Sequence, residues 1–159
     1  MTVFFSGDEI INMAVKTEET GYEFYRLAEK NAKSEGLKNL FDYLAKEELK
    51  HKEIFLGLKG LIKESPQGLP VDWNELDLYI KAMTDSSFFL GGNKDINLAV
   101  KASDDKEAIR FAFNFEKDTL LYFYQIRDIV KAADREVVDR IINEEKNHIR
   151  KLAEVKKNL

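Results

Sequence analysis

The chain has no cysteine, which excludes disulfide bonds, thiolate metal sites and thiol-based redox chemistry. It also lacks any apolar run near the roughly 18 residues that a membrane-spanning helix needs. The start of the chain, Met1-Thr-Val-Phe-Phe5, is too short and uncharged for a signal peptide, so we expect a cytoplasmic protein. Basic residues are scattered and the net charge is −4, which argues against nucleic acid or an anionic membrane as partner.

Helix breakers are also scarce, with two prolines and eight glycines in 159 residues. Together with 34% charged residues, this composition favours long helices with charged outer faces over a sheet protein. Ser34 and Asp134 are expected to cap the second and fourth helices, and either Ser103 or Asp104, the latter with Glu107, is expected to open the third. The predicted helices span residues 7–33, 35–64, 104–131 and 135–157.

The spacing of the helices predicts how they connect. Only a few residues separate the first helix from the second and the third from the fourth, so each pair should form an antiparallel hairpin. The segment 65–103 can cross the length of a bundle and is expected to carry short helices near 73–84 and 95–101. We therefore predict one all-α domain over residues 1–159, a four-helix bundle of two hairpins, about 7–64 and 104–157.

Both histidines of the chain stand three residues after a glutamate, in Glu48-Leu-Lys-His51 and Glu145-Lys-Asn-His148. This spacing places a carboxylate and an imidazole one turn apart on the same helix face. Two such pairs, plus one glutamate from each of two other helices, form the ligand set of di-iron and di-manganese carboxylate bundles. The two motifs therefore indicate first of all a metal-binding site.

An internal repeat supplies the two further glutamates, Glu18 and Glu116. They are 98 residues apart, while the paired glutamates and the paired histidines are each 97 apart. In every predicted helix these residues fall on a stripe of apolar or small residues spaced three and four apart, the face that points into a bundle. The six candidate metal ligands are Glu18, Glu48, His51, Glu116, Glu145 and His148.

Charge balance favours a metal at this position. A buried, isolated carboxylate costs several kcal/mol, and four would also repel one another. No stripe carries a lysine or arginine that could compensate them. Two ferrous ions would bring +4 against the −4 of four glutamates, with neutral imidazoles filling further coordination positions.

Other residues near the stripes allow more than one interpretation. Tyr25 could hydrogen-bond a ligand as a second-layer residue of the site, or simply fill volume in the bundle. Gly21 and Thr119 are small and could leave space for an oxidant or allow close helix packing. The third helix has more aromatic residues than one stripe needs. Part of them should pack against the second helix or the crossover segment, and some could form a dimer face. We interpret the neighbouring glutamates as surface residues: Glu19, Glu23, Glu47 and Glu144.

The chain resembles rubrerythrin-type di-iron domains of the ferritin-like superfamily over nearly its whole length. The motifs that carry the resemblance are Glu18-x-x-Gly-x-x-Phe-Tyr25, Glu47-Glu48-Leu-Lys-His51, Phe115-Glu116-Lys-Asp118 and Glu144-Glu145-Lys-Asn-His148. The resemblance implies a centre of two iron ions, although manganese or zinc would also suit the donors. It implies that Glu48 and Glu145 bridge the metals, that Glu18 and His51 complete one, and that Glu116 and His148 complete the other.

The same resemblance implies a redox protein, in which these glutamates are catalytic as metal ligands. Its oxidant would be hydrogen peroxide or dioxygen, and its assembly a homodimer. Rubrerythrins carry a further carboxylate where this chain has Thr119, and most bring electrons in through a cysteine-ligated domain that this chain lacks. A separate electron donor, such as a rubredoxin-like protein, is therefore expected. An iron-handling ferroxidase and a helical interaction module with a structural metal remain as alternatives.

Overall fold

The computed structural model describes residues 7–59, 78, 101–130 and 132–159. Within this part of the chain it contains four long helices and one short 3-10 turn, and no strand. The all-α prediction is therefore confirmed. The elements are α1 (Gly7–Asn31), α2 (Glu35–Gly57), α5 (Asp105–Ile129), the 3-10 turn η1 (Ala132–Asp134) and α6 (Arg135–Lys156).

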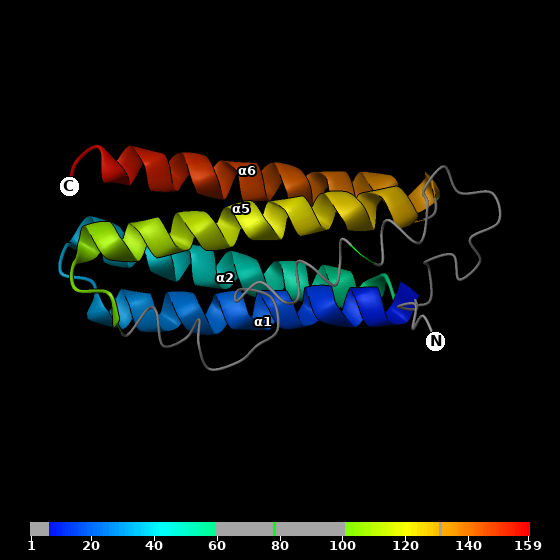
Figure 1. The fold of residues 1–159 in the computed structure, drawn as a ribbon, viewed down its shortest axis with the longest axis horizontal. Coiled ribbons are helices and arrows are strands. Elements are labelled where there is room, and N and C mark those ends of the chain that lie inside the picture. Colours follow the sequence, from blue (N-terminus) through cyan, green and yellow to red (C-terminus); the bar gives the residue numbers. More distant parts are fainter. Residues whose placement is uncertain (1–6, 60–77, 79–100, 131) are drawn as a thin grey trace.

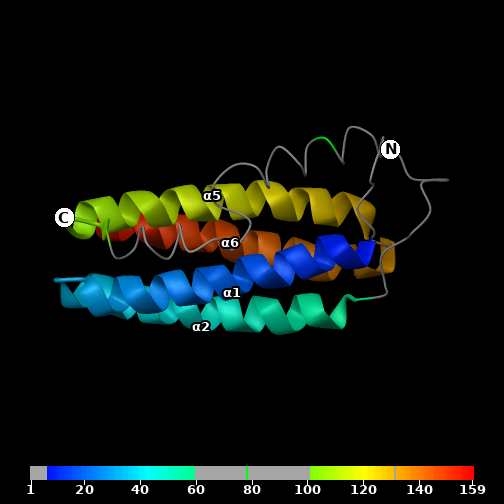
Figure 2. The ribbon, with the colours of Figure 1, turned by 60° about the horizontal axis from the view of Figure 1, so that its bottom comes forward.

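The helices pair as two antiparallel hairpins that lie side by side (Figure 1). Helix α1 packs along α2 and α5 along α6, while α1 also contacts α5 and α2 contacts α6. Figure 2 shows the same four-helix bundle after rotation about its long axis. The end of α2 and the start of α5 lie at opposite ends of the bundle (Figure 1). Apart from one residue in each, the short helices predicted near 73–84 and 95–101 lie outside the described residues.

Local hydrogen bonds explain where most helices begin. The Ser34 hydroxyl accepts from the backbone N–H of Leu37, which confirms this predicted cap. The Asp104 carboxylate accepts from the backbone N–H of Glu107, so Asp104, and not Ser103, is the cap of α5. The predicted cap at Asp134 is wrong, because this side chain makes no capping hydrogen bond. Asp134 ends the 3-10 turn with a helical backbone, whereas a capping residue is normally extended.

The second helix is shorter than predicted. It ends at Gly57 instead of residue 64, and the backbone N–H of Leu58 bonds to the carbonyls of Leu56 and Phe55. These short-range bonds tighten the last turn and close the helix.

Among the described residues, no helix combines the length and apolar character that a bilayer crossing requires.

The predicted stripes form the core of the bundle. A stripe consists of the residues that lie three and four positions apart in line with the candidate ligands of a helix. On α1 and α5 all of these residues are buried, on α2 they are buried up to Leu58, and on α6 up to Leu152. The apolar ones separate into two clusters, one toward each end of the bundle. The first cluster includes Ile11, Phe55, Phe123, Ile126 and Ile141, and the second Tyr25, Leu37, Phe41, Ile109 and Leu152.

The aromatic residues of α5 pack mostly inward. Phe115 and Tyr122 are buried, and the others are partly buried against the two apolar clusters. The Tyr122 hydroxyl donates a hydrogen bond of 2.7 Å to the backbone carbonyl of Ile10, which ties α5 to the first turns of α1. Interior packing therefore accounts for much of this surplus of aromatics, and the dimer face stays a prediction.

We predict that Tyr122→Phe lowers the free energy of unfolding by about 1 kcal/mol, because it removes a buried hydrogen bond while keeping the ring. For a chain of this size, that corresponds to a melting temperature lower by about 2–4 °C. Thermal unfolding followed by circular dichroism measures the change. Tyr124→Phe, at a half-buried position on the same helix, is the control and should shift the midpoint less.

Candidate metal centre

All four helices contribute to one buried polar cluster between the two apolar clusters. Glu18 comes from α1 and Glu116 from α5, and each is fully buried. Helices α2 and α6 each contribute two side chains because three residues separate the glutamate from the histidine. These four side chains are Glu48 and His51 on α2 and Glu145 and His148 on α6, each at most 1% exposed.

The cluster contains two overlapping sets of donor atoms. Within each set, one donor atom from every residue lies within 4.8 Å of the others. The two sets share Glu48 and Glu145, as expected of carboxylates between two neighbouring ions. The sets are Glu18, Glu48, His51 and Glu145, and Glu48, Glu116, Glu145 and His148.

The cluster is short of hydrogen-bond donors. All four carboxylate oxygens of Glu18 and Glu48 are buried, and no group of the described chain donates a hydrogen bond to them. Buried polar atoms normally have a partner. Oxygen and imidazole nitrogen donors converging without partners suit divalent iron, manganese or zinc. The residues present therefore fit a pair of metal ions.

Both histidines direct the same ring nitrogen into the cluster. His51 Nδ1 lies 2.7 Å from Glu145 Oε1, and His148 Nδ1 lies 3.0 Å from Glu145 Oε2 and 3.5 Å from Glu116 Oε1. The two rings stack with centroids 5.5 Å apart and planes 20° from parallel. The Nδ1 atoms are thus the candidate metal donors, and the Nε2 atoms lie on the other side of each ring, where His51 Nε2 is 2.8 Å from Glu144 Oε2.

Burial makes the metal-free cluster hold protons on its carboxylates. Desolvation raises the pKa of Glu18 and Glu48 well above the usual range. The charges of Glu145 and Glu116 raise both further, while Glu18 raises the pKa of Glu48 and Glu48 partly lowers that of Glu18. The pKa of Glu116 rises to about 8, mainly through burial and secondly through the charge of Glu145. Metal ions must displace these protons in order to bind.

The histidines and Glu145 form the charged part of the metal-free cluster. Burial alone would lower the pKa of both histidines, but the carboxylates outweigh it. The pKa of His51 rises to about 9, chiefly through Glu145, and that of His148 to about 12 through Glu116 and Glu145. Burial would likewise raise the pKa of Glu145, but the two histidines hold it below the usual range.

Comparison with known proteins identifies the family. The sequence profile of the rubrerythrin family matches residues 9–156, which is nearly the whole chain. The chain belongs to the rubrerythrin family. A crystal structure from Thermotoga maritima, described as that of a ferritin-like diiron-carboxylate protein, superposes with a TM-score of 0.66 at 28% sequence identity. The match covers 99% of this chain and 98% of that one, whereas a search of curated proteins finds no match.

The ferritin-like four-helix bundle predicted from the sequence is therefore confirmed, and with it the membership of a di-iron carboxylate family. The structure brings all six predicted ligands together. Their assignment as metal ligands, the number of ions and the identity of the metal stay predictions.

Tyr25 lies directly against the centre of this rubrerythrin-family chain. Its buried hydroxyl donates a hydrogen bond to Glu116 Oε1, and its ring contacts those of Phe24 and Phe115. Desolvation raises the pKa of Tyr25 well above the usual range, and the neighbouring carboxylates, Glu116 foremost, raise it further. The hydroxyl therefore keeps its proton and acts as a donor, as in the first of the two roles considered for this residue.

The two small residues of the site differ in their surroundings. A Cβ added at Gly21 would lie 2.9 Å from ring carbons of Phe115 and 3.0 Å from the carboxyl carbon of Glu48. The lack of a side chain at Gly21 thus serves close packing. Thr119, where the family usually has a carboxylate, is fully buried, and its hydroxyl makes no hydrogen bond within the described part of the chain.

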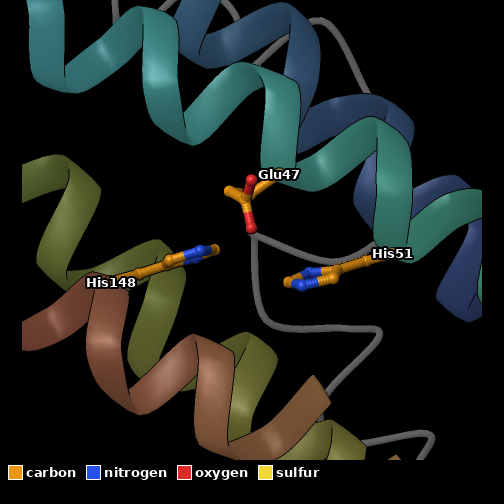
Figure 3. Close-up of side chains that lie close together, drawn as sticks. All are labelled: Glu47, His51 and His148. Atoms are coloured by element: carbon orange, nitrogen blue, oxygen red, sulfur yellow. The ribbon is translucent and has the colours of Figure 1, made fainter. Parts of the chain in front are cut away.

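Two glutamates interpreted as surface residues lie close to the histidines of the centre. Glu47 is only 9% exposed, so its interpretation as a surface residue is wrong. A carboxylate oxygen of Glu47 lies within 4.8 Å of a ring nitrogen of both His51 and His148 (Figure 3). Glu144 is exposed, but its Oε2 lies 2.8 Å from His51 Nε2. The 97-residue repeat, which relates Glu47 to Glu144, is the signal that could have marked both.

We predict that Gly21→Ala destabilises the protein and weakens metal binding. Alanine normally stabilises a helix interior by about 1 kcal/mol relative to glycine. Here the added Cβ would have to displace Phe115 and Glu48. Thermal unfolding and the metal content after dialysis measure the two effects.

The control for this substitution is Gly36→Ala, because a Cβ at Gly36 meets nothing within 4 Å. It should leave metal content unchanged and should not lower the melting temperature. A Gly21→Ala variant as stable as the Gly36→Ala variant, with full metal content, would contradict the close packing inferred here.

We further predict that the metal-free protein loses stability as the pH rises from about 5 to 9. The raised pKa values of Glu116 (about 8) and His51 (about 9) mean that the folded chain binds more protons than the unfolded chain in this range. The free energy of unfolding therefore falls with increasing pH. Glu145 has the opposite sign, but it acts only as the pH falls below about 4.5.

Melting temperatures of chelator-treated and zinc-loaded protein across this pH range test the prediction. The decline should be steep without metal and small or reversed with zinc, because metal replaces the bound protons. A metal-free protein that becomes more stable between these pH values would show that the cluster does not hold its protons.

Proposed function

We propose that this chain is a non-haem di-iron oxidoreductase that reduces hydrogen peroxide with electrons from a separate donor. The observation that carries the proposal is the pair of donor sets that share Glu48 and Glu145 in the buried core. Shared carboxylates hold two ions close to each other, as two-electron chemistry requires. When bound, two iron ions in such a set supply the electrons that reduce an oxidant.

The side chains of the site would hold the metals and keep water out. Glu18 and His51 would complete one metal position and Glu116 and His148 the other. The Tyr25 hydroxyl donates to Glu116, which orients this ligand and holds a proton beside it. The apolar clusters on both sides limit access, which favours an oxidant as small as hydrogen peroxide or dioxygen.

The electrons would come from another molecule. The chain has no cysteine and so cannot hold a thiolate-ligated iron centre of its own. A rubredoxin-like protein is the class of donor that the family resemblance favours. A homodimer and a cytoplasmic location belong to the same proposal and rest on the resemblance and on the expectations from the sequence.

Thr119 favours a second candidate function, that of a ferroxidase in iron handling. With a hydroxyl in place of the family's additional carboxylate, the centre has no ligand at this position that could exchange with a histidine as iron changes oxidation state. A protein that oxidises iron with dioxygen and passes it on needs no such exchange. A purely structural metal in a helical interaction module is the third possibility.

Anaerobic reconstitution with ferrous iron, followed by stopped-flow mixing with hydrogen peroxide or dioxygen, tests these functions. We expect two irons per chain and much faster oxidation by peroxide, because the proposed reaction is peroxide reduction. Preference for dioxygen would support the ferroxidase. Binding of fewer than two irons, or no reaction with either oxidant, would overturn the redox proposal.

The same assay on Glu116→Ala separates catalysis from structure. This variant should keep its helical circular dichroism yet lose one metal and most of the peroxide reaction, because Glu116 belongs to only one donor set. Glu136→Ala, at an exposed position in the first turn of α6, is the control and should react like the wild type.

A further inference from the structure

The two histidines of the centre differ at their outer nitrogens. His51 Nε2, on α2, lies 2.8 Å from Glu144 Oε2, on α6. His148 Nε2, on α6, is buried and has no hydrogen-bond partner among the residues that the structure describes. Since a buried N–H without an acceptor is unfavourable, His148 needs an acceptor on its outer side.

The internal repeat indicates which residue supplies that acceptor. Glu47 and Glu144 are 97 residues apart, the same separation as His51 and His148. By this repeat, the pair Glu47 and His148 corresponds to the pair Glu144 and His51. Figure 3 shows Glu47 beside the two histidine rings, which project toward each other from α2 and α6. One carboxylate oxygen of Glu47 lies within 4.8 Å of a ring nitrogen of each histidine.

A competing contact explains why Glu47 does not bond to His148 here. The Glu47 carboxylate accepts a hydrogen bond from the ammonium group of Lys50, one turn further along α2. The Lys50 side chain is 67% exposed and that of Glu47 12%. An ion pair with an exposed lysine contributes little to stability because water and salt screen it. Glu47 can therefore turn from Lys50 to the buried ring of His148 without a large loss.

We propose that Glu47 and Glu144 are positioning residues that hold the two histidine ligands in a crossed arrangement. Glu144 of α6 accepts from Nε2–H of His51 on α2, and Glu47 of α2 accepts from Nε2–H of His148 on α6. Each carboxylate fixes the proton on Nε2, so that the lone pair of Nδ1 points toward the metal position. The inference rests on the metal centre of the proposed function but does not depend on the oxidant.

Zinc affinity, measured by competition with a chelating dye, tests the proposal without any redox step. Glu144→Ala and Glu47→Ala should each bind zinc about 10–100-fold more weakly than the wild type, the usual effect of removing such a partner. Glu154→Ala on α6 and Glu53→Ala on α2 are the matched controls, because both glutamates are exposed. Affinities of the Glu47 and Glu144 variants equal to those of the controls would overturn the proposal.

Lys50→Met separates the positioning role of Glu47 from a merely structural one. If Glu47 holds His148, removing its competitor should leave zinc affinity unchanged or raise it, whereas Glu47→Ala lowers it. If Glu47 only pairs with Lys50, both substitutions should act in the same direction, and the proposal fails.

Nuclear magnetic resonance of the histidine side chains in zinc-loaded protein gives an independent readout. The wild type should show two Nε2–H protons protected from exchange. Glu47→Ala should lose the signal of His148 and keep that of His51, and Glu144→Ala should do the reverse. Wild-type protein that binds fewer than two zinc ions would show that the metal centre itself is wrong. Full zinc binding with both signals unchanged in the variants would show that only the crossed arrangement is wrong.

Discussion

The burial of four carboxylates in one helical core is the constraint on which the rest of this structure depends. No lysine or arginine is among the buried residues that the structure describes, so positive charge must come from elsewhere. Two histidines supply part of it, and in the metal-free chain they keep Glu145 ionised while the other three glutamates tend to retain protons. Two divalent ions would replace those protons, which links folding, protonation and metal binding in one site.

The apolar clusters on both sides give this constraint its strength. They place the carboxylates in a medium of low dielectric, where charges without partners are most unfavourable and attraction to a cation is greatest. Close packing around the carboxylates also restricts the positions of individual atoms. The ring of Phe115 and the carboxyl group of Glu48 lie so near Gly21 that a methyl group there would have to displace them. The same packing places the Tyr25 hydroxyl on Glu116, so that the wall of the site also orients a ligand.

The sequence predicted the bundle and its central cluster well because both depend on helical periodicity. Spacings of three and four residues identify the inward face, and a glutamate on such a face is unusual enough to be informative. Periodicity does not report how far a flanking side chain reaches across to another helix. Glu47 and Glu144 stand next to the inward stripes, and only their distances to the rings of His51 and His148 reveal their contacts.

Helix ends were harder to predict for a related reason. A capping residue acts through its backbone conformation as well as its side chain, and sequence reports only the side chain. Asp134 has a suitable carboxylate but a helical backbone, so it ends a 3-10 turn without capping α6. Asp105, by contrast, accepts hydrogen bonds from the backbone N–H groups of Lys33 and Ser34. This contact joins the two hairpins across more than 70 positions of sequence, which no local pattern indicates.

Thr119 connects the charge of the centre to its chemistry. A fifth carboxylate at this position would leave two ferrous ions with one excess negative charge, whereas four carboxylates balance them. The balanced set gains nothing from releasing a ligand, and the buried Thr119 hydroxyl offers no charged replacement for one. Ligands that stay in place need firm support, which Glu144 gives at the outer nitrogen of His51 and which we propose for Glu47 at His148. Oxidation of two ferrous ions held there would add two positive charges, which the release of protons or the anionic oxygen of a reduced oxidant would balance, with no exchange of protein ligands.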